Sequence, residues 1–267
     1  MEKLIITQPS AARRSPRSTT PRCPTAVEEM VREAKSAFEA GAAVIHVHVR
    51  EDDGTPTQDR ERFRVVLDAI KEACPGVILI PSTGGAVGMT AEERLQPTEL
   101  FPEMATLDCG TCNFGDDVFT NDMPTMRAFG KRMMENHIKP EYECFEIGHL
   151  DTVVNMANKG EVPGAPMQFN FVLGVSGCTP ATVGNLDYLV KQIPAGSTWS
   201  AFGVGKGHLP ILFASLALGG HIRVGMEDNV VYEVKENGEK VMATNHMLVE
   251  RAVNAVKAFG NTPATPD

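Results

Sequence analysis

Short apolar runs rich in β-forming residues alternate with helical patterns along all 267 residues, and this alternation constrains the fold most. Most of the runs are continuously apolar, which is typical of strands covered on both faces. The predicted strands are Leu4–Thr7, Ala43–His48, Val77–Pro81, Met104–Leu107, Lys139–Cys144, Met167–Val172, Ser197–Gly203 and His221–Val224. The predicted helices are 26–40, 59–73, 122–136, 148–159, 180–192, 208–218 and 243–259, and the less regular stretch 86–103 predicts only a short helix.

Eight strand–helix units in a chain of this length predict a (β/α)8 TIM barrel of the α/β class. A doubly wound sheet is the alternative, but it would place a glycine-rich nucleotide-binding turn where the chain has Gln8-Pro-Ser-Ala11. No linker or repeat is visible, so we expect one domain over residues 1–267. Its first βα loop, about residues 8–25, is long and rich in arginine, and its prolines exclude the amphipathic helix of a transit peptide.

Charge and composition exclude several classes of protein. The chain carries 25 basic and 34 acidic residues, a formal net charge of −9, which argues against nucleic acid as a partner. No window of about 18 apolar residues lacks charge, so we expect no membrane span. The six cysteines are irregularly spaced and no signal peptide is visible. We therefore expect reduced thiols and a cytoplasmic protein.

Two histidines end the second predicted strand, and they indicate a metal site. His46 and His48 are two residues apart, so on a strand they point to the same face. Glu227 follows the eighth strand and can supply a third ligand, because strand 8 of a closed barrel lies close to strand 2. Two histidines and a carboxylate suit zinc, although iron or manganese would accept the same ligands. The alternatives are core histidines and a solvated turn at Glu227.

Arg223 lies within the apolar eighth strand, where a buried guanidinium needs an anionic partner. Asp228 or a substrate carboxylate could provide it, and a purely structural ion pair is the alternative. His221 lies two residues earlier, and we expect both side chains to face the barrel interior.

Glycine-rich segments follow two other strands. Ser82, Thr83, Gly84 and Gly85 come after the third strand and predict a cradle for a carboxylate, with a simple tight turn as the alternative. Lys206 stands among glycines after the seventh strand, where barrels often bind phosphate. It is a candidate contact for the phosphates of CoA, unless the glycines only form a turn.

Several motifs together resemble the beta-keto acid cleavage enzymes, from Leu4 to Pro266. The motifs are His46-Val-His48, Ser82-Thr-Gly-Gly85, Glu103-Met-Ala-Thr106, Asn113-Phe-Gly115 and Gly220-His-Ile-Arg-Val-Gly-Met-Glu-Asp-Asn229. The resemblance implies a zinc-dependent (β/α)8 barrel that assembles as a homotetramer. It implies the reaction of a β-keto acid with acetyl-CoA to give acetoacetate and a new acyl-CoA. It also implies substrate contacts at Thr106 and Glu143.

The same resemblance assigns roles around the metal. His46, His48 and Glu227 would hold zinc, Asp228 would be the general base, and Arg223 would assist Asp228 or polarise the thioester carbonyl. The residues suit this chemistry, because chelation of a β-keto acid by a cation acidifies its α-carbon. The resulting enolate would attack the acetyl thioester, and a retro-Claisen step would release the products.

One position departs from the family pattern. Family members that act on amino-substituted keto acids are expected to have a glutamate at the position of Arg14, which would hold the substrate ammonium. Arginine inverts that charge, and we therefore expect a substrate with an anionic tail, such as the β-keto dicarboxylate 3-oxoadipate. The alternative is that the arginines of this loop face solvent or the phosphates of CoA.

Two other functions remain open from the sequence. A metal-dependent hydrolase or retro-aldol lyase could use the same strand-end histidines without CoA. A non-catalytic binding barrel is the other, although burying so many ionisable groups without a function is costly.

Overall fold

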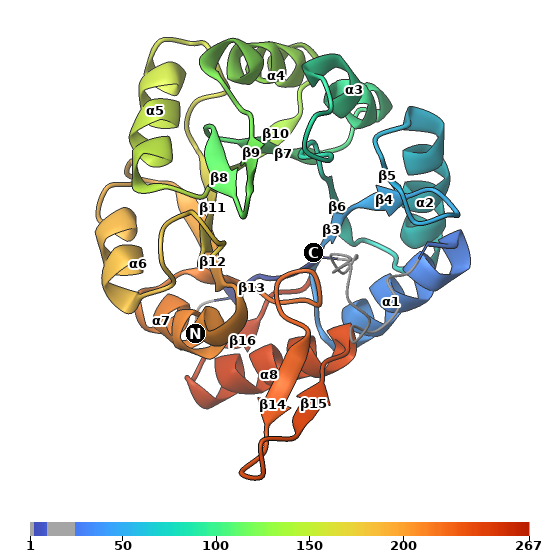
Figure 1. The fold of residues 1–267 in the computed structure, drawn as a ribbon, viewed down its shortest axis with the longest axis vertical. Helices are drawn as coiled ribbons and strands as arrows, with labels where there is room; N and C mark the ends of the chain where they lie inside the picture. Colours follow the sequence, from blue (N-terminus) through green and yellow to red (C-terminus); the bar gives the residue numbers. More distant parts are fainter. Residues whose placement is uncertain (1–2, 10–24, 267) are drawn as a thin grey trace.

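A computed structural model describes residues 3–9 and 25–266. Eight parallel strands form one sheet that curves into a nearly closed ring, with helices around its outside (Figure 1). The strands, in spatial order, are β6 (Ile78–Pro81), β3 (Val44–Val47), β2 (Ile6–Pro9), β13 (His221–Arg223), β12 (Thr198–Gly203), β11 (Gln168–Leu173), β10 (Lys139–Cys144) and β7 (Met104–Asp108). The predicted (β/α)8 barrel is confirmed.

The two strands at the ends of the sheet, β6 and β7, are joined by side chains. The amide of Thr83 donates a hydrogen bond to Thr106 Oγ1 over 2.9 Å, and Thr83 Oγ1 donates to the Thr106 carbonyl over 2.7 Å. These bonds close the ring at the point where the strand order begins and ends.

Within residues 3–9 and 25–266, eight α-helices follow the strands. They are α1 (Val27–Ala40), α2 (Arg60–Ala73), α3 (Ala91–Leu95), α4 (Met123–Glu135), α5 (Ile147–Asn158), α6 (Val183–Val190), α7 (His208–Ala217) and α8 (Asn245–Ala258). The stretch 86–103 does hold only a short helix, α3, continued by the 3-10 turn Gln96–Leu100. A capping box of Thr90 and Glu93 starts it. In the described part of the chain, no helix is long and apolar enough to cross a membrane.

Short two-stranded sheets lie outside the eight-stranded sheet. Strands β8 (Cys112–Phe114) and β9 (Asp117–Phe119) form a hairpin that lies across the mouth of the ring in Figure 1. The others are β4 (Val49–Arg50) with β5 (Pro56–Thr57), β14 (Val231–Val234) with β15 (Lys240–Met242), and β1 (Lys3–Leu4) with β16 (Thr262–Pro263). The sequence patterns predicted none of these pairs, because the runs are too short to show a period.

Every second residue of a barrel strand points inward, so the side chains inside the barrel are arranged in layers. Ile5, Val44, Ile78 and Met104, near the amino ends of their strands, pack in one apolar cluster with Ile80. Buried polar side chains follow along the strands: Thr7, Thr106, Glu141, Asn170 and Ser200. The outer faces of the strands pack on the helices through two large apolar clusters. These buried polar side chains therefore lie between the apolar cluster and the carboxyl ends of the strands.

Candidate active site at the carboxyl ends of the strands

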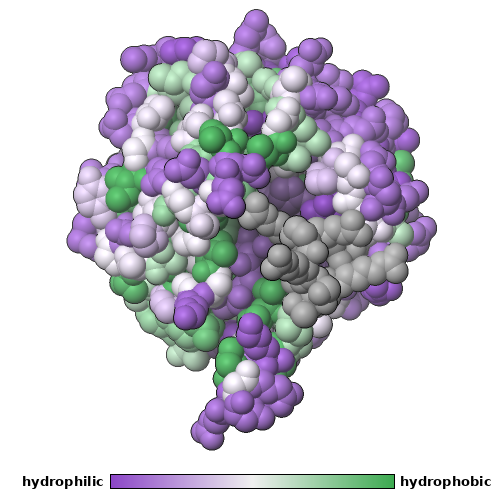
Figure 2. Space-filling view, in the orientation of Figure 1, coloured by the Kyte–Doolittle hydropathy of each residue, from purple (hydrophilic) through white to green (hydrophobic). Residues whose placement is uncertain are grey.

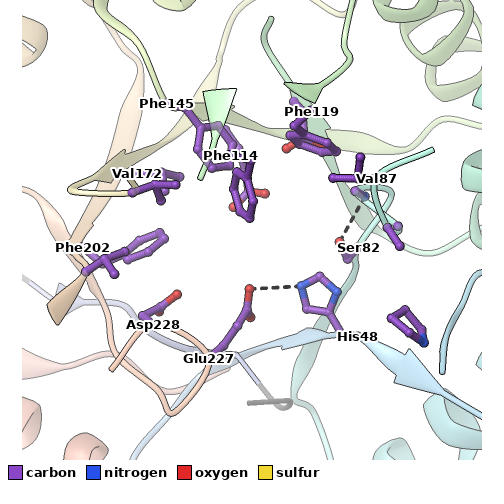
Figure 3. A pocket seen from close by; sticks show the side chains of 18 of the residues that line it. His48, Ser82, Val87, Phe114, Phe119, Phe145, Val172, Phe202, Glu227 and Asp228 are labelled. Atoms are coloured by element: carbon purple, nitrogen blue, oxygen red, sulfur yellow. Dashed lines mark hydrogen bonds and ion pairs between the residues drawn. The ribbon is translucent and has the colours of Figure 1, made fainter. Parts of the chain in front are cut away.

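A cavity of about 550 Å³ opens at the carboxyl ends of the barrel strands. Figure 2 shows this end of the molecule, where hydrophilic residues lie around a hollow near the centre of the view. Polar residues from the ends of five strands line the cavity: His48, Ser82, Asp108, Glu143, Arg223, Glu227 and Asp228. An apolar wall of Phe114, Phe119, Phe145, Val172 and Phe202 also lines the cavity, and in Figure 3 Phe114, Phe119 and Phe145 lie across from His48 and Glu227.

The three predicted metal ligands converge at one edge of this cavity. His46 lies on β3, His48 directly follows that strand, and Glu227 lies in the turn after β13. The Nε2 atoms of the two imidazoles are 3.0 Å apart, and His48 Nε2 is 3.2 Å from Glu227 Oε1 (Figure 3). The potential ligand atoms of the three residues all lie within 4.8 Å of one another.

This donor set fits a divalent cation. Glu227 Oε2 is buried without a hydrogen-bond partner among the described residues, and it lies 4.0 Å from His46 Nε2. Burial lowers the pKa of His46, which keeps the ring in its neutral, ligating form. Burial acts to raise the pKa of Glu227, but His48 and Arg223 outweigh it and hold that pKa below its ordinary value. The carboxylate is therefore charged, as a ligand must be.

Arg223 is the hub of an ion-pair network beside these ligands. Its Nε and Nη2 donate to the two oxygens of Asp228 over 3.1 and 3.0 Å, and its Nη1 donates to Glu143 Oε1 over 2.9 Å. Nη2 also lies 3.2 Å from Glu227 Oε1, and the guanidinium stacks 4.3 Å from the Phe202 ring centre. Burial alone would lower the pKa of Arg223, but the surrounding carboxylates raise it well above its ordinary value.

Asp228 faces the cavity from this network. Burial raises its pKa to about 6, against the opposing effect of Arg223. At neutral pH the carboxylate is therefore mostly ionised while it remains basic enough to accept a proton. The expected partnership between Arg223 and Asp228 is present, and Glu143 joins it.

The Ser82–Gly85 segment forms one side of the cavity. Ser82, Gly84 and Gly85 line it, and the Gly84 amide donates to Ser82 Oγ over 3.1 Å. Gly85 has a φ of +63°, and a Cβ there would lie 2.9 Å from Met89 Sδ, so the position requires glycine. Thr83 and Thr106 bond each other at the seam of the barrel and are not among the cavity-lining residues.

Two predicted positions lie apart from the ligand cluster, and a third lies outside the described residues. Lys206 is exposed in the 3-10 turn Gly205–Gly207 and is not among the cavity-lining residues. Arg14 and most of the predicted arginine-rich loop lie outside the described residues. His221 Nδ1 accepts from the Ile5 amide over 3.3 Å, so this ring lies deeper in the barrel than Arg223.

Sequence reasoning missed a second buried arginine network. Arg94 donates to Asp108 Oδ2 over 3.1 Å, to Asn121 Oδ1 over 2.6 Å and to the Thr83 carbonyl over 2.8 Å. Its guanidinium lies 5.0 Å from the ring centre of Phe119 on β9. Arg94 thus fixes the cavity-lining segment, the end of β7 and the hairpin together. It lies on a short helix, where nothing in the local pattern marks it as buried.

Two buried polar residues of the strands were also missed. Asn170 donates to Glu143 Oε1 over 2.9 Å and so shares that oxygen with Arg223. Glu141 is buried, and burial raises its pKa to about 7. The signal was available, because Glu141 and Glu143 are polar residues at alternate positions of one strand.

The fold and the site define a class of protein: a (β/α)8-barrel enzyme with a cluster of potential metal ligands and a paired arginine–aspartate at its strand ends. Comparison with known proteins narrows this class. A family model described as beta-keto acid cleavage enzyme matches residues 3–267. The chain belongs to the beta-keto acid cleavage enzyme family, as its motifs indicated.

Relatives and solved structures agree with this assignment. The chain is 51% identical over 271 residues to a 3-keto-5-aminohexanoate cleavage enzyme of Acetoanaerobium sticklandii, covering 100% of this chain and 96% of the relative. It is 34% identical over 248 residues to a 3-oxoadipate:acetyl-CoA acetyltransferase of Cupriavidus necator, covering 92% and 85%.

Among solved structures, the chain resembles ObcA in a ternary complex with a C4-CoA adduct and oxalate. The TM-score is 0.80 at 20% identity, covering 91% of this chain and 65% of that one. The chain thus spans less than two thirds of that larger protein, and at this identity the likeness shows the fold.

Proposed function

We propose that the protein transfers the acyl group of a β-keto acid to CoA, using acetyl-CoA and releasing acetoacetate, with a divalent cation, zinc first, held by His46, His48 and Glu227. One observation carries the proposal: His48 and Glu227 of the ligand cluster line the same cavity as the Arg223–Asp228 pair, and His46 lies beside them. When bound, the cation would act as a Lewis acid that acidifies the α-carbon of the keto acid.

Asp228 takes the proton from that carbon. The carboxylate is held by both of its oxygens against Arg223, so its orientation is fixed before substrate binds. Arg223 also opposes the rise in the pKa of Asp228 that burial causes, which keeps the base ionised at neutral pH. After proton removal, the α-carbon attacks the acetyl thioester and expels the CoA thiolate. That thiolate then adds to the original keto carbonyl, and the bond from this carbonyl to the α-carbon breaks, which gives the new acyl-CoA and, once the α-carbon takes back a proton, acetoacetate.

The remaining cavity residues position the substrate and exclude water. Ser82, Gly84 and Gly85 are placed to receive a carboxylate. The apolar wall of Phe114, Phe119, Phe145, Val172 and Phe202 keeps the reacting carbon dry, which strengthens every charge interaction in the cavity. Thr106 lies behind the cavity wall and holds Thr83, which stands between Ser82 and Gly84, and Glu143 acts through Arg223.

The first βα loop is our basis for proposing the charge of the substrate tail. Arg14 favours an anionic tail, such as that of 3-oxoadipate, and one relative is named for that substrate. Two relatives of about half identity are named for 3-keto-5-aminohexanoate, which carries a cationic amino group instead. The charge of the tail is thus the point on which this chain would differ from them.

The test is acetoacetate formation from β-keto acids with an amino, a neutral and a carboxylate tail, with and without acetyl-CoA, before and after chelation. We expect acetyl-CoA-dependent, chelator-sensitive turnover that prefers the carboxylate tail. Arg14→Glu should shift the preference towards the amino tail, and unchanged kinetics would overturn the role of Arg14. Turnover without acetyl-CoA would indicate a hydrolase or lyase. No turnover and no bound metal would indicate a binding barrel.

We further propose that Lys206 meets a phosphate of CoA, and that the protein is a cytoplasmic homotetramer. Lys206→Ala should raise KM for acetyl-CoA and leave KM for the keto acid unchanged. The described cysteines are all free, which supports a reducing compartment. Light scattering on the purified protein tests the oligomeric state.

A further inference from the structure

The ring of His46 has two nitrogens, and the structure leaves one of them facing a carboxylate. Nε2 belongs to the ligand cluster, 3.0 Å from His48 Nε2. Nδ1 is buried, has no hydrogen-bond partner among the described residues, and lies 3.9 Å from Glu141 Oε1. That oxygen is also buried without a partner in the described part of the chain. The two side chains are only 1% and 2% exposed.

His46 Nδ1 and Glu141 Oε1 face each other without hydrogen-bond partners among the described residues. This needs an explanation, since buried polar atoms nearly always have partners. Glu141 lies two residues before Glu143 on β10, so it shares that residue's face but lies one layer deeper. It is not among the residues that line the cavity, whereas Glu143 is. Glu143, in contrast, is bonded to both Arg223 and Asn170.

The chemistry of a ligating imidazole supplies the explanation. A neutral imidazole carries one proton, and a nitrogen that binds a metal must use its lone pair. If His46 binds through Nε2, its proton is on Nδ1, which then needs an acceptor. Histidines that bind metals usually donate this second N–H to a carboxylate, a carbonyl or water, and that bond fixes the ring and raises its basicity.

We propose that Glu141 is a positioning residue of the metal centre, whose carboxylate accepts the Nδ1 proton of His46 and fixes the ring with Nε2 towards the cation. The inference rests on the proposed function for the cation itself. An N–H···O bond needs about 2.7–3.2 Å, so the carboxylate has to move by about 1 Å to form it. Glu141 thereby selects the tautomer of His46 without touching substrate or metal.

The experiment measures zinc affinity by competition with a chromophoric chelator. Glu141→Met has a similar shape but no acceptor, and Glu141→Gln keeps a neutral acceptor. We expect zinc affinity to fall about 10–100-fold in Glu141→Met and less in Glu141→Gln. In the metal-free proteins, Glu141→Met should melt no lower than the wild type, because it removes a buried carboxyl group that has lost solvation. Visible spectra of the cobalt-loaded proteins should also differ.

Ser200→Ala is the matched control, since Ser200 is a buried polar residue of the same layer that bonds Asn170 rather than His46. It should change stability but not zinc affinity. A lower melting temperature with unchanged zinc affinity in Glu141→Met would show a purely structural role and overturn the proposal. If that variant does not fold, unchanged affinity in Glu141→Gln would overturn it equally. A wild type that binds no zinc would instead refute the proposed metal centre.

Discussion

Individual side chains give this barrel an excess of buried negative charge. Asp108, Glu141, Glu143 and Asp228 are buried and Glu227 is half-buried, whereas the buried cations facing them are the guanidinium groups of Arg94 and Arg223. Burying unpaired charge is costly, so an arrangement of this kind favours a bound cation. The same excess explains why burial raises the pKa of several of these acids instead of leaving all of them ionised.

Asp228→Asn tests the base directly. Asparagine keeps the shape and one acceptor for Arg223 but cannot take a proton from carbon. We expect kcat to fall by about 10²–10⁴-fold, the usual contribution of a general base. Zinc affinity should remain close to that of the wild type, because Asp228 is not in the ligand cluster. Wild-type kcat in the zinc-loaded variant would assign the proton transfer to another group.

His208 predicts a pH dependence of stability away from the active site. It is buried at the start of α7 with Nε2 unpartnered among the described residues, and burial lowers its pKa to about 4. In the unfolded chain the pKa of histidine is about 6.5, so between these values the unfolded state binds more protons. This histidine therefore stabilises fully above pH 6.5, and its contribution is lost as pH falls towards 4, by about 3 kcal/mol in total.

Urea unfolding at a series of pH values measures that loss. His208→Gln should flatten the slope of unfolding free energy between pH 6.5 and 4. His246→Gln changes an exposed histidine on α8 and controls for the loss of an imidazole as such. An identical slope in His208→Gln and wild type would contradict the argument.

Among the elements, the short helix α3 connects several segments around the cavity. Its Arg94 holds the carbonyls of Thr83 and Thr120 and the side chains of Asp108 and Asn121, and so connects the end of β6 with β7 and the β8–β9 hairpin. The hairpin carries Phe114 and Phe119 of the apolar wall. The wall therefore depends on a residue outside the cavity.

Arg94→Met should destabilise the protein by about 3–5 kcal/mol, because it leaves Asp108 as an unpaired buried carboxylate. The measurement is the free energy of unfolding in urea. Arg94→Met combined with Asp108→Asn should recover part of the loss, since no charge is then left unpaired. Arg127→Met, which removes the exposed ion pair with Glu161, should cost at most about 1 kcal/mol. Equal losses in the two single variants would contradict the assignment.

Some elements and site residues could be predicted from the sequence, and others could not. The barrel strands were predictable because each is a continuous apolar run, and His46, His48 and Glu227 were predictable because strand ends converge in a barrel. The β8–β9 hairpin was not, because three-residue strands carry no measurable period. Arg94 was not, because burial of a helical arginine depends on Asp108 and Asn121, which are distant in sequence.

At the scale of the whole molecule, binding and folding are linked. The ligand cluster joins β3 near the start of the chain with the turn after β13 near its end, so a bound cation would connect distant parts of the barrel. A ligand that binds only the folded state stabilises it by mass action. Metal loading should therefore appear as a global stability change and not only as activity.

Zinc at about 100 times its dissociation constant should raise the unfolding free energy by about 2.7 kcal/mol. For a chain of this size that corresponds to an increase in Tm of roughly 5–10 °C. Differential scanning calorimetry of the chelated and reloaded protein measures it. His48→Ala is the matched control and should show no increase. An equal increase in that variant would place the zinc elsewhere.

The seam between β6 and β7 has a consequence for substrate choice. In the described part of the chain, main-chain ladders join the other neighbouring strands, whereas Thr83 and Thr106 clasp this junction through side chains. Barrel closure at this junction therefore depends on these two side chains. Ser82 lies on one side of that junction and Asp108 on the other, both in the cavity wall. We expect exchange of these two threonines to change the spacing of Ser82 and Asp108, and so the acyl groups that the cavity accepts, without altering a metal ligand or the base.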